Sequence, residues 1–322
     1  MSRHNSAFFD QNGKQSYLWK ELSQAGAQFL ETIKIVCLLF AIVYEFGKLT
    51  PPFTWTTSCG QCMQNEFGDV TVQMRGHVAI VEICRPPYNF FDVELIEDLV
   101  SAFSSLDLNG ECRASVLAAQ GTAFCAGANF TEGPSVLDKD DPQQGNSLYA
   151  AAVKLFACEK PIVAAIHGTA AGGGLGLALV ADFRVTCPEA RFTANFTRLG
   201  IHPGFGLTHT LPSLIGMQHA NLMFYTGRRI GGELAHQWGL ADVLTERDRV
   251  RDEAVSLAAE IAESAPLALV STRKTMRNNL AERVKSFSDH EDQEQTWLSQ
   301  TEDFQEGVKA VAERRTGSFR GC

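Results

Sequence analysis

The chain opens its recognisable pattern at about Asp69, where short apolar runs begin to alternate with longer segments of helical periodicity. Residues 70–74 and 77–83 have the apolar content of two strands, and Arg75-Gly76 separates them. Asp92 has the position of a helix N-cap, and apolar residues recur behind it at helical spacing through about Phe103. This pattern predicts two strands followed by a helix.

The alternation continues for about another hundred residues. We expect strands at 114–119 and 162–166, a helix around 147–157, a second helix that begins at Gly172 or Gly173, and short strands at 183–186 and 191–193. After about Pro203 the strand signals almost vanish and helices dominate to the end of the chain. Repeated strand–helix crossovers followed by helices predict a layered α/β core with a helical C-terminal region.

Two glycine-bearing stretches follow two of the predicted strands. They are Gly121-Thr122-Ala123-Phe124-Cys125-Ala126-Gly127-Ala128-Asn129-Phe130 and His167-Gly168-Thr169-Ala170-Ala171-Gly172-Gly173-Gly174-Leu175-Gly176. Either stretch alone is most simply interpreted as a turn after a strand. Together they can bring two backbone amides onto one oxygen, which stabilises the negative charge of a thioester enolate or a tetrahedral species.

This pair of stretches resembles the signature of the crotonase (enoyl-CoA hydratase/isomerase) superfamily. The likeness extends over about Asp69 to Cys322 and includes the segments 225–230, 239–243, 303–310 and 314–319, in the family's order. It implies an α/β fold, a crotonase-like spiral of ββα units with two perpendicular sheets, and a C-terminal helical region that forms trimers. We therefore divide the chain into an extension at 1–68, a spiral core at 69–260 and a helical region at 261–322.

By the family's motif, the two amide donors are those of Ala128 and Gly173. Gly173 opens a predicted helix, where free amides and the helix dipole both favour negative charge. The family's Asp after the first donor is Asn129 here, and we interpret Asp182 as a structural residue at a helix end.

The resemblance also implies where the carrier of the acyl group lies. Coenzyme A, as part of the substrate and not as a permanently bound cofactor, is expected along Cys125, Ala126 and Phe130. Arg85 and Lys274 are candidate contacts for its phosphates, although most surface Arg and Lys are simply solvated.

The two glutamates with which the family's hydratases activate water are missing. Their positions are Gly176 and Phe196, and the acid of the dienoyl isomerases is replaced by Gly204. General acid–base catalysis contributes about 10²–10⁴-fold, so ordinary hydration is disfavoured. Decarboxylation of a malonyl-type or glutaconyl-type thioester, or double-bond isomerisation, is favoured instead.

The segment 192–212 is similar to the isomerase/decarboxylase branch of polyketide β-branching clusters, although that branch's catalytic lysine has no match before Lys139. Candidate proton carriers are His202, because histidine is the residue type best suited to proton transfer at neutral pH, and Glu132, which follows the first glycine stretch. The alternative for His202 is a role in capping or packing, and the alternative for Glu132 is a solvated side chain in a loop. Tyr149 and His209 are candidates only by elimination, Asn195 and Thr193 can hydrogen-bond a substrate, and His167 is best interpreted as a core residue.

Composition narrows the function further. The net charge of −9 disfavours nucleic acid as a partner. Several of the nine cysteines lie in apolar runs, which is typical of reduced, buried thiols, and Cys59-Gly60-Gln61-Cys62 has no second pair at a zinc-like spacing, so no metal site is expected. Residues 35–44 are apolar but too few to cross a bilayer. The extension is an amphipathic helix, a membrane-surface or partner contact, or an upstream addition to the gene.

The sequence thus predicts a cytoplasmic, trimeric or hexameric enzyme that acts on an acyl-CoA or acyl-carrier-protein thioester. Two alternatives stay open. One is hydration by a non-standard mechanism, and the other is a family member that binds CoA thioesters without turnover.

Overall fold

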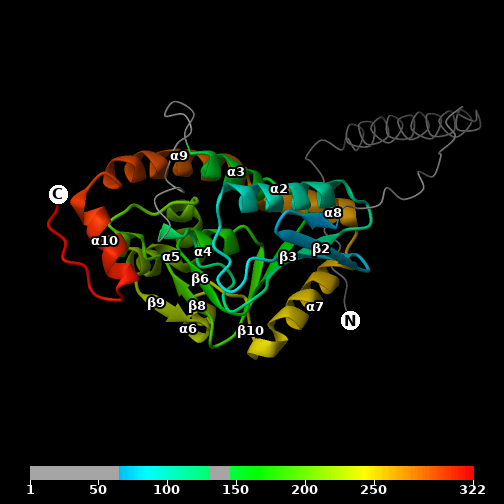
Figure 1. Ribbon diagram of the computed structural model, residues 1–322. Coiled ribbons are helices and arrows are strands. Elements are labelled where there is room, and N and C mark those ends of the chain that lie inside the picture. The colour runs from blue at the N-terminus through cyan, green and yellow to red at the C-terminus, as the bar shows by residue number, and fades with distance from the viewer. Residues whose placement is uncertain (1–64, 131–145) are drawn as a thin grey trace, which may run out of the picture. The chain divides into compact units, whose positions relative to one another are not determined.

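The structure, a computed structural model, describes residues 65–130 and 146–322 (Figure 1). The chain divides into the units Met1–Met63 and Gln64–Cys322, and the described residues all belong to the second. The segment 35–44, the Cys59–Cys62 pair, Glu132 and Lys139 lie outside the described residues.

A seven-stranded mixed sheet forms the centre of this unit. Its strand order is β1-β2-β3-β4-β5-β7-β10. The first three strands pair antiparallel and the remaining neighbours pair parallel. The strands are β1 (Glu66–Phe67), β2 (Val70–Arg75), β3 (Val78–Ile83), β4 (Ala114–Ala119), β5 (Ile162–Ile166), β7 (Phe183–Thr186) and β10 (Val243–Leu244).

A second, three-stranded sheet lies beside the glycine-bearing loops. Its order is β6 (Thr169–Ala171), β8 (Arg191–Thr193), β9 (Arg229–Gly231). β6 is parallel to β8, and β8 is antiparallel to β9. β6 holds the chain immediately before Gly172 and Gly173, so this small sheet positions the second glycine stretch.

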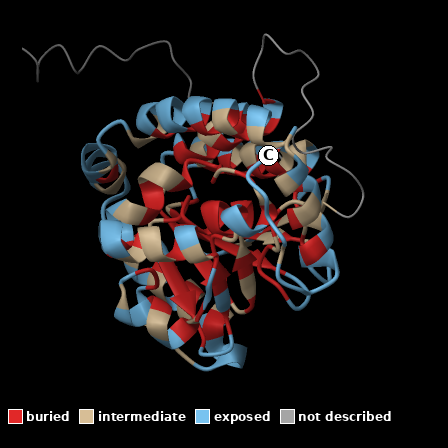
Figure 2. Ribbon diagram, turned by 90° about the vertical axis from the view of Figure 1, so that its left-hand side faces the viewer, coloured by how far each residue is buried: buried red, intermediate tan, exposed pale blue. Residues whose placement is uncertain are grey.

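Helices cover the large sheet and supply its packing partners. α7 packs against β3, β4, β5 and β7, while α2 packs on α3 and α3 on α9. All residues of β4 and β5 are buried, as expected for strands covered on both faces, and the outer helices bury one face and expose the other (Figure 2). The helices are α2 (Val93–Leu108), α3 (Ser147–Phe156), α4 (Gly173–Ala178), α5 (Leu207–Thr226), α6 (Gly232–Gln237), α7 (Val250–Ala262), α8 (Pro266–Arg277), α9 (Leu280–Leu298) and α10 (Glu302–Ala312), with 3₁₀ turns η2 (Phe196–Leu199) and η3 (Arg247–Arg249).

Most of the predicted elements are confirmed. The strands at 114–119, 162–166, 183–186 and 191–193 match the structure, and the Asp92 side chain accepts from the Leu95 amide at 2.9 Å as an N-cap. α2 continues to Leu108, beyond the predicted end, because Leu106 extends the buried stripe. The pattern did not predict β1, β6, β9 or β10, which are two or three residues long and too short for a period-2 signal.

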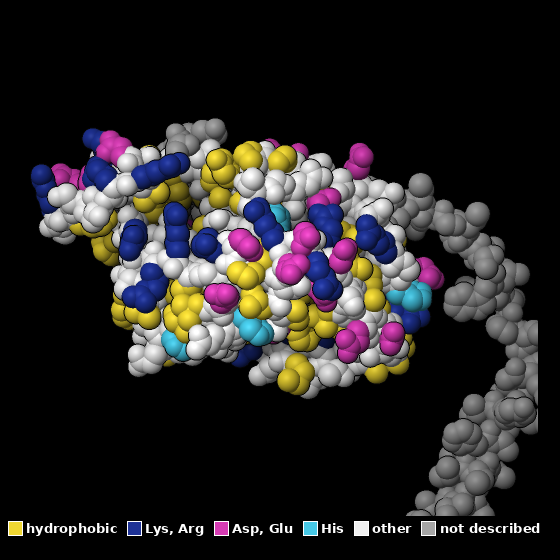
Figure 3. All heavy atoms as spheres, turned by 90° about the horizontal axis from the view of Figure 1, so that it is seen from below, with side chains coloured by type: hydrophobic (Ala, Val, Ile, Leu, Met, Phe, Trp, Pro, Cys, Tyr) yellow, Lys and Arg dark blue, Asp and Glu magenta, His cyan; other side chains and the backbone are white. Residues whose placement is uncertain are grey.

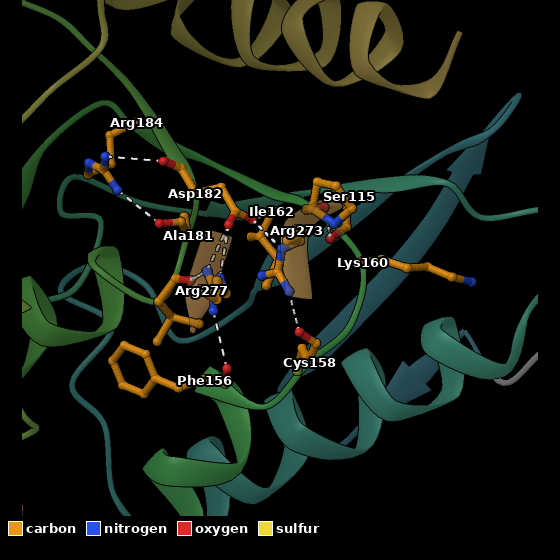
Figure 4. Close-up of polar contacts among 12 residues, drawn as sticks. Ser115, Phe156, Cys158, Lys160, Ile162, Ala181, Asp182, Arg184, Arg273 and Arg277 are labelled. Carbon is orange, nitrogen blue, oxygen red and sulfur yellow. Dashed lines mark hydrogen bonds and ion pairs between the residues drawn. The ribbon is translucent and has the colours of Figure 1, made fainter. Parts of the chain in front are cut away.

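The contacts of Asp182 confirm that it is a structural residue. Its carboxylate accepts from the Ile162 amide at 2.8 Å, from Arg273 at 2.9 Å and from Arg277 at 3.0 Å (Figure 4). Both arginines belong to α8, so this one carboxylate ties α8 to the start of β5.

Candidate active site

The first glycine stretch runs directly beside the second. The Cys125 amide donates to Thr169 O and the Ala171 amide donates to Cys125 O, both at 3.0 Å. Gly127 adopts φ +86°, and a Cβ built on it would lie 2.7 Å from Ala171 O and 3.7 Å from the Gly173 nitrogen. The two stretches therefore meet as predicted, and a side chain at residue 127 would force them apart.

The second stretch places Gly173 at the first position of α4. Gly172 precedes it with φ +53°, and its amide donates to Thr193 O at 2.9 Å. A Cβ on Gly173 would lie 2.3 Å from the ring of Phe91, and one on Gly174 would lie 2.1 Å from Cys125 O. Only glycine fits this close approach of backbone to backbone and to ring.

Among the residues that the structure describes, the amides of Ala128 and Gly173 have no hydrogen-bond acceptor in the protein. An amide in the first turn of a helix has no intrahelical partner, which explains Gly173. Both residues line the same cavity. Two unbonded N–H groups at one cavity wall are available to an oxygen of a ligand.

The cavity has a volume of about 270 Å³ and a predominantly apolar wall. Within the described part of the chain, Tyr149 is the only titratable side chain that lines it. The lining residues are Phe90, Phe91, Ala126, Gly127, Ala128, Asn129, Phe130, Leu148, Tyr149, Ala171, Gly172, Gly173, Asn195, Phe196, Leu199, Ile201, Gly204, Phe205, Gln295, Val308, Val311 and Ala312.

Tyr149, on α3, is held by a hydrogen bond from the opposite helix. Its hydroxyl donates to Gln295 Oε1 at 2.5 Å, and Gln295 Nε2 donates to His202 O at 2.7 Å. A carbonyl only accepts, so the bond to His202 O fixes which end of the Gln295 amide faces Tyr149. Burial, with a smaller contribution from the negative charge of Glu291, raises the pKa of Tyr149, so it stays protonated at neutral pH.

Of the predicted carrier contacts, Ala126 and Phe130 line this cavity. Phe130 also packs edge-on against Phe304 of α10, with ring centroids 6.1 Å apart. Cys125 is fully buried behind the wall, and burial raises the pKa of its thiol to about 12, so it is a packing residue whose backbone joins the two stretches.

The two predicted phosphate contacts do not lie at the cavity. Arg85 pairs with Asp69 at 2.5 Å and with Asp92 at 2.6 Å, and these carboxylates raise its pKa against the opposing effect of burial, which is the largest single influence. Lys274 is exposed on α8 and is absent from the cavity wall. The geometry argues against Arg85 as a phosphate ligand, because its charge is already neutralised.

His202 lies outside the cavity that contains Ala128 and Gly173. Its imidazole Nδ1 is 2.8 Å from Pro203 O, and the residue lines a different hollow with Trp297 and Phe319. This placement argues against its predicted role as proton carrier, because its side chain does not share the space of the two amides. Glu132, the other candidate, lies outside the described residues.

Of the remaining polar candidates, one lines the cavity and two lie away from it. Asn195 lines the cavity, and its Oδ1 lies 3.8 Å from the position of a Cβ on Gly172. Thr193 is buried and its hydroxyl donates to Gly227 O at 3.3 Å, away from the cavity. His167 lines a separate hollow with Arg247, and its ring nitrogen is 3.1 Å from Gly121 O.

The structure shows what occupies the two positions at which the family's hydratases carry glutamates. A Cβ on Gly176 would lie 2.7 Å from the Cβ of Phe205, so a glutamate does not fit at this position while Phe205 is present. Phe196 occupies the second acid position and contributes its ring to the cavity wall. Both substitutions are visible in the sequence. Gln295 is not, because the sequence of α9 has no motif that distinguishes this residue from the other inward-facing residues of the helix.

The described residues lack the features of two other classes of protein, metalloproteins and proteins with a membrane-spanning helix. Residues 65–130 and 146–322 contain no group of three or more His, Cys, Asp or Glu side chains that could hold a metal ion. No single helix within them has the length and apolar content needed to cross a membrane; one pair, 247–262 with 266–298, meets the criterion only when its two parts are joined across a bend of 107°.

Comparisons with known proteins show which family the chain belongs to. Residues 73–321 match the family model described as enoyl-CoA hydratase/isomerase. An enoyl-CoA isomerase/hydratase of Zymoseptoria tritici is 32% identical over 266 residues, which are 76% of this chain and 84% of that protein. A carnitinyl-CoA dehydratase of Salmonella enteritidis is 28% identical over 250 residues, 76% of this chain and 96% of its own length.

The fold class is confirmed by solved structures. The crystal structure of an enoyl-CoA hydratase/isomerase from Pseudoalteromonas atlantica covers 78% of this chain and 100% of its own, with a TM-score of 0.71 and 26% identity. The α/β architecture, the glycine-lined cavity and the matched family model lead to one conclusion: the chain belongs to the enoyl-CoA hydratase/isomerase family.

Proposed function

We propose that the chain stabilises the enolate of an acyl thioester with the amides of Ala128 and Gly173, and that it forms this enolate by removing CO₂ from a carboxyl group on the α-carbon. The observation that carries the proposal is the cavity wall itself. It presents two unbonded amides and, among the described residues, a single titratable side chain that is a protonated tyrosine.

Decarboxylation suits this wall because it needs no base. The bond between the α-carbon and the carboxylate breaks, its electron pair enters the enolate, and the thioester oxygen takes the negative charge. The two amides donate to that oxygen, and each such donor is typically worth about 3 kcal/mol of transition-state stabilisation. CO₂ leaves as a neutral molecule, and the α-carbon then accepts one proton.

The apolar wall favours the same reaction. A carboxylate that enters a cavity lined by Phe and Ala side chains loses hydration, which raises its free energy. Loss of CO₂ moves that charge to the oxygen that faces the amides. The environment therefore stabilises the charge after bond cleavage better than before it, which is the condition for catalysis.

Tyr149 is the proposed proton donor. Rotation of its hydroxyl about the Cζ–Oη bond turns the proton from Gln295 toward the cavity, and the tyrosinate left after transfer regains a proton from water. A raised pKa makes Tyr149 a poor base. It can return a proton to an enolate, but it does not remove one from the α-carbon or the γ-carbon of an acyl chain.

Hydration and isomerisation are the rival reactions, and the names of the relatives include hydratase, isomerase and dehydratase. Hydration uses acid–base catalysis at two points, and isomerisation needs one group that carries a proton between carbons. Among the described residues of the wall, Tyr149 alone titrates, so neither rival has its full set of groups there.

The test is incubation of the purified chain with malonyl-CoA, methylmalonyl-CoA, a 3-enoyl-CoA and crotonyl-CoA, each analysed by mass spectrometry. We expect the first or second to lose CO₂ and the other two to stay unchanged. Conversion of crotonyl-CoA to its hydroxyacyl product, or of the 3-enoyl-CoA to its 2-isomer, without any decarboxylation would contradict the proposal.

The role of Tyr149 is tested by Tyr149→Phe. We expect kcat to fall about 10²–10⁴-fold with little change in substrate affinity, because the phenyl ring fills the same space. Tyr225→Phe is the matched control, since the Tyr225 side chain is 73% exposed on α5 and does not line the cavity. Equal rates in the two variants would remove Tyr149 from the mechanism.

A further inference from the structure

A groove lined by arginines lies next to the cavity. It has a volume of about 1020 Å³, and no carboxylate side chain of the described residues lines it. Basic side chains gather at this end of the molecule, where α10 and β9 lie (Figure 3). The lining residues are Asn195, Arg198, Gly227, Arg228, Arg229, Val311, Arg314, Arg315, Thr316, Gly317 and Phe319.

The positive charge of this arginine groove is largely uncompensated. Arg315 pairs with Glu306 and Glu313. The Arg198 and Arg228 side chains donate to the carbonyl and hydroxyl oxygens of Thr226. Within the described residues, none of Arg198, Arg228, Arg229 and Arg314 has a carboxylate partner. The whole chain has 37 acidic and 28 basic residues, so a hollow to which the described residues contribute five arginines and no acid departs from the general composition.

The groove and the cavity share two lining residues, Asn195 and Val311. Asn195 Oδ1 lies 3.8 Å from the position of a Cβ on Gly172, the residue before the Gly173 amide. The groove therefore begins beside the proposed reaction centre. Ala126 and Phe130 line the cavity but not the groove, so the expected carrier position along these two residues is separate from the arginines.

We propose that the arginine groove binds a second carboxylate at the far end of the acyl group, so that, among the thioesters that this chain binds, it prefers those of acids that carry a distal carboxylate. The inference rests on the proposed function in one respect, that the thioester oxygen sits at Ala128 and Gly173. The carboxylate next to the α-carbon leaves as CO₂ from the apolar cavity, and the distal one stays on the arginines.

Arginine is suited to this task. Its planar guanidinium presents paired donors that match the two oxygens of a carboxylate, and it stays protonated at any working pH. One exposed arginine gains little from such a pair. Several arginines that converge on one hollow raise the local potential and attract an anion together.

The experiment measures binding of saturated thioesters by titration calorimetry. These ligands have neither a carboxylate on the α-carbon nor a carbon–carbon double bond, so they are not substrates of decarboxylation, isomerisation or hydration. The pairs are succinyl-CoA with butanoyl-CoA, adipoyl-CoA with hexanoyl-CoA, and suberoyl-CoA with octanoyl-CoA, because the members of a pair have the same carrier and chain length and differ in the terminal carboxylate. We expect the chain to bind at least one dicarboxylic member about 10-fold more tightly than its neutral partner, a preference that shrinks with added salt.

The variant Arg228→Gln/Arg229→Gln is expected to remove that preference and to leave the affinity for the neutral thioesters unchanged. Both side chains are exposed, so the fold should tolerate the change. Arg75→Gln, an exposed arginine at the end of β2 and outside the groove, is the matched control and should keep the preference.

Two outcomes would overturn the inference. One is the absence of any preference in the unaltered chain. The other is an equal loss of affinity for both members of each pair in the double variant, which would assign the arginines to the phosphates of the carrier. Since none of these ligands reacts, a failure of decarboxylation leaves this measurement unaffected, and the two proposals are tested separately.

Discussion

At the scale of single residues, the candidate site depends on contacts that leave no room for a side chain. A Cβ on Gly204 would lie 2.0 Å from Tyr149 Oη and 2.7 Å from Gln295 Nε2. Gly204 thus lets the hydroxyl of Tyr149 reach the cavity wall. In the sequence, the same glycine is distinguished only as the replacement of the dienoyl isomerases' acid, because its neighbours across the fold come from α3 and α9.

The raised pKa of Tyr149 has a measurable consequence. The folded chain keeps this proton at a pH where the unfolded chain, with a tyrosine pKa of about 10, loses it. The contribution of Tyr149 to the free energy of unfolding is therefore complete below about pH 10 and declines as the pH rises above that value. We expect the stability of the unaltered chain to fall more steeply there than that of Tyr149→Phe.

The measurement is urea unfolding of both proteins at several pH values from about 8 to 11, together with the tyrosinate absorbance of the folded chains. If the difference spectrum between them shows an ionisation midpoint near 10, Tyr149 has an ordinary pKa and its buried environment is not as described.

At the scale of elements, one carboxylate joins α8 to the core. Asp182 accepts from Arg273 and Arg277, whose side chains are 7% and 13% exposed (Figure 4). In the part of the chain that the structure describes, Arg273 Nη2 is buried and has no hydrogen-bond partner. Arg273 also donates to Cys158 O, so it links α8 to the segment that follows α3. This cluster of Asp182, Arg273 and Arg277 has two positive charges and one negative charge. Loss of the Asp182 carboxylate would therefore leave both arginines without the counter-charge that they share.

Asp182→Asn is therefore expected to destabilise the fold by about 3–5 kcal/mol, because it leaves two buried guanidinium groups without a counter-charge. Chemical denaturation followed by circular dichroism measures the change. Asp289→Asn is the control, since Asp289 forms an exposed pair with Lys285 on α9, and we expect it to cost about 0.5 kcal/mol. Equal effects of the two substitutions would show that the Asp182 cluster does not hold α8.

At the scale of the whole molecule, residues distant in sequence close the site. The first glycine stretch, α3, the second glycine stretch, η2, α9 and α10 all contribute to one wall, and α10 supplies Val308, Val311 and Ala312. The helical C-terminal region is consequently part of the candidate active site. Its predicted role in trimer formation stays a prediction.

The unit Gln64–Cys322 contains every residue that the proposals use. We expect a chain that begins at Gln64 to keep the thermal stability and turnover of the full chain, because β1 starts at Glu66 and a domain with its own core folds alone. Differential scanning calorimetry and the decarboxylation assay test this. A loss of either property would show that the first 63 residues take part in folding or catalysis.

The sequence alone determined the order of the main strands, the N-cap at Asp92, the two glycine stretches, and the absence of acids at Gly176 and Phe196. These features depend on local periodicity, on backbone freedom, or on motifs that stay contiguous along the chain.

Only the tertiary structure decided which side chains share the cavity with the amides of Ala128 and Gly173. It brought Tyr149 and Gln295 to the wall, placed His202 elsewhere, paired Arg85 with two carboxylates, and gathered Arg198, Arg228, Arg229, Arg314 and Arg315 beside Asn195. These outcomes depend on contacts between residues that are distant in the sequence. The packing of the elements sets the direction of a side chain at such a contact, and the neighbouring residues in the chain do not determine it.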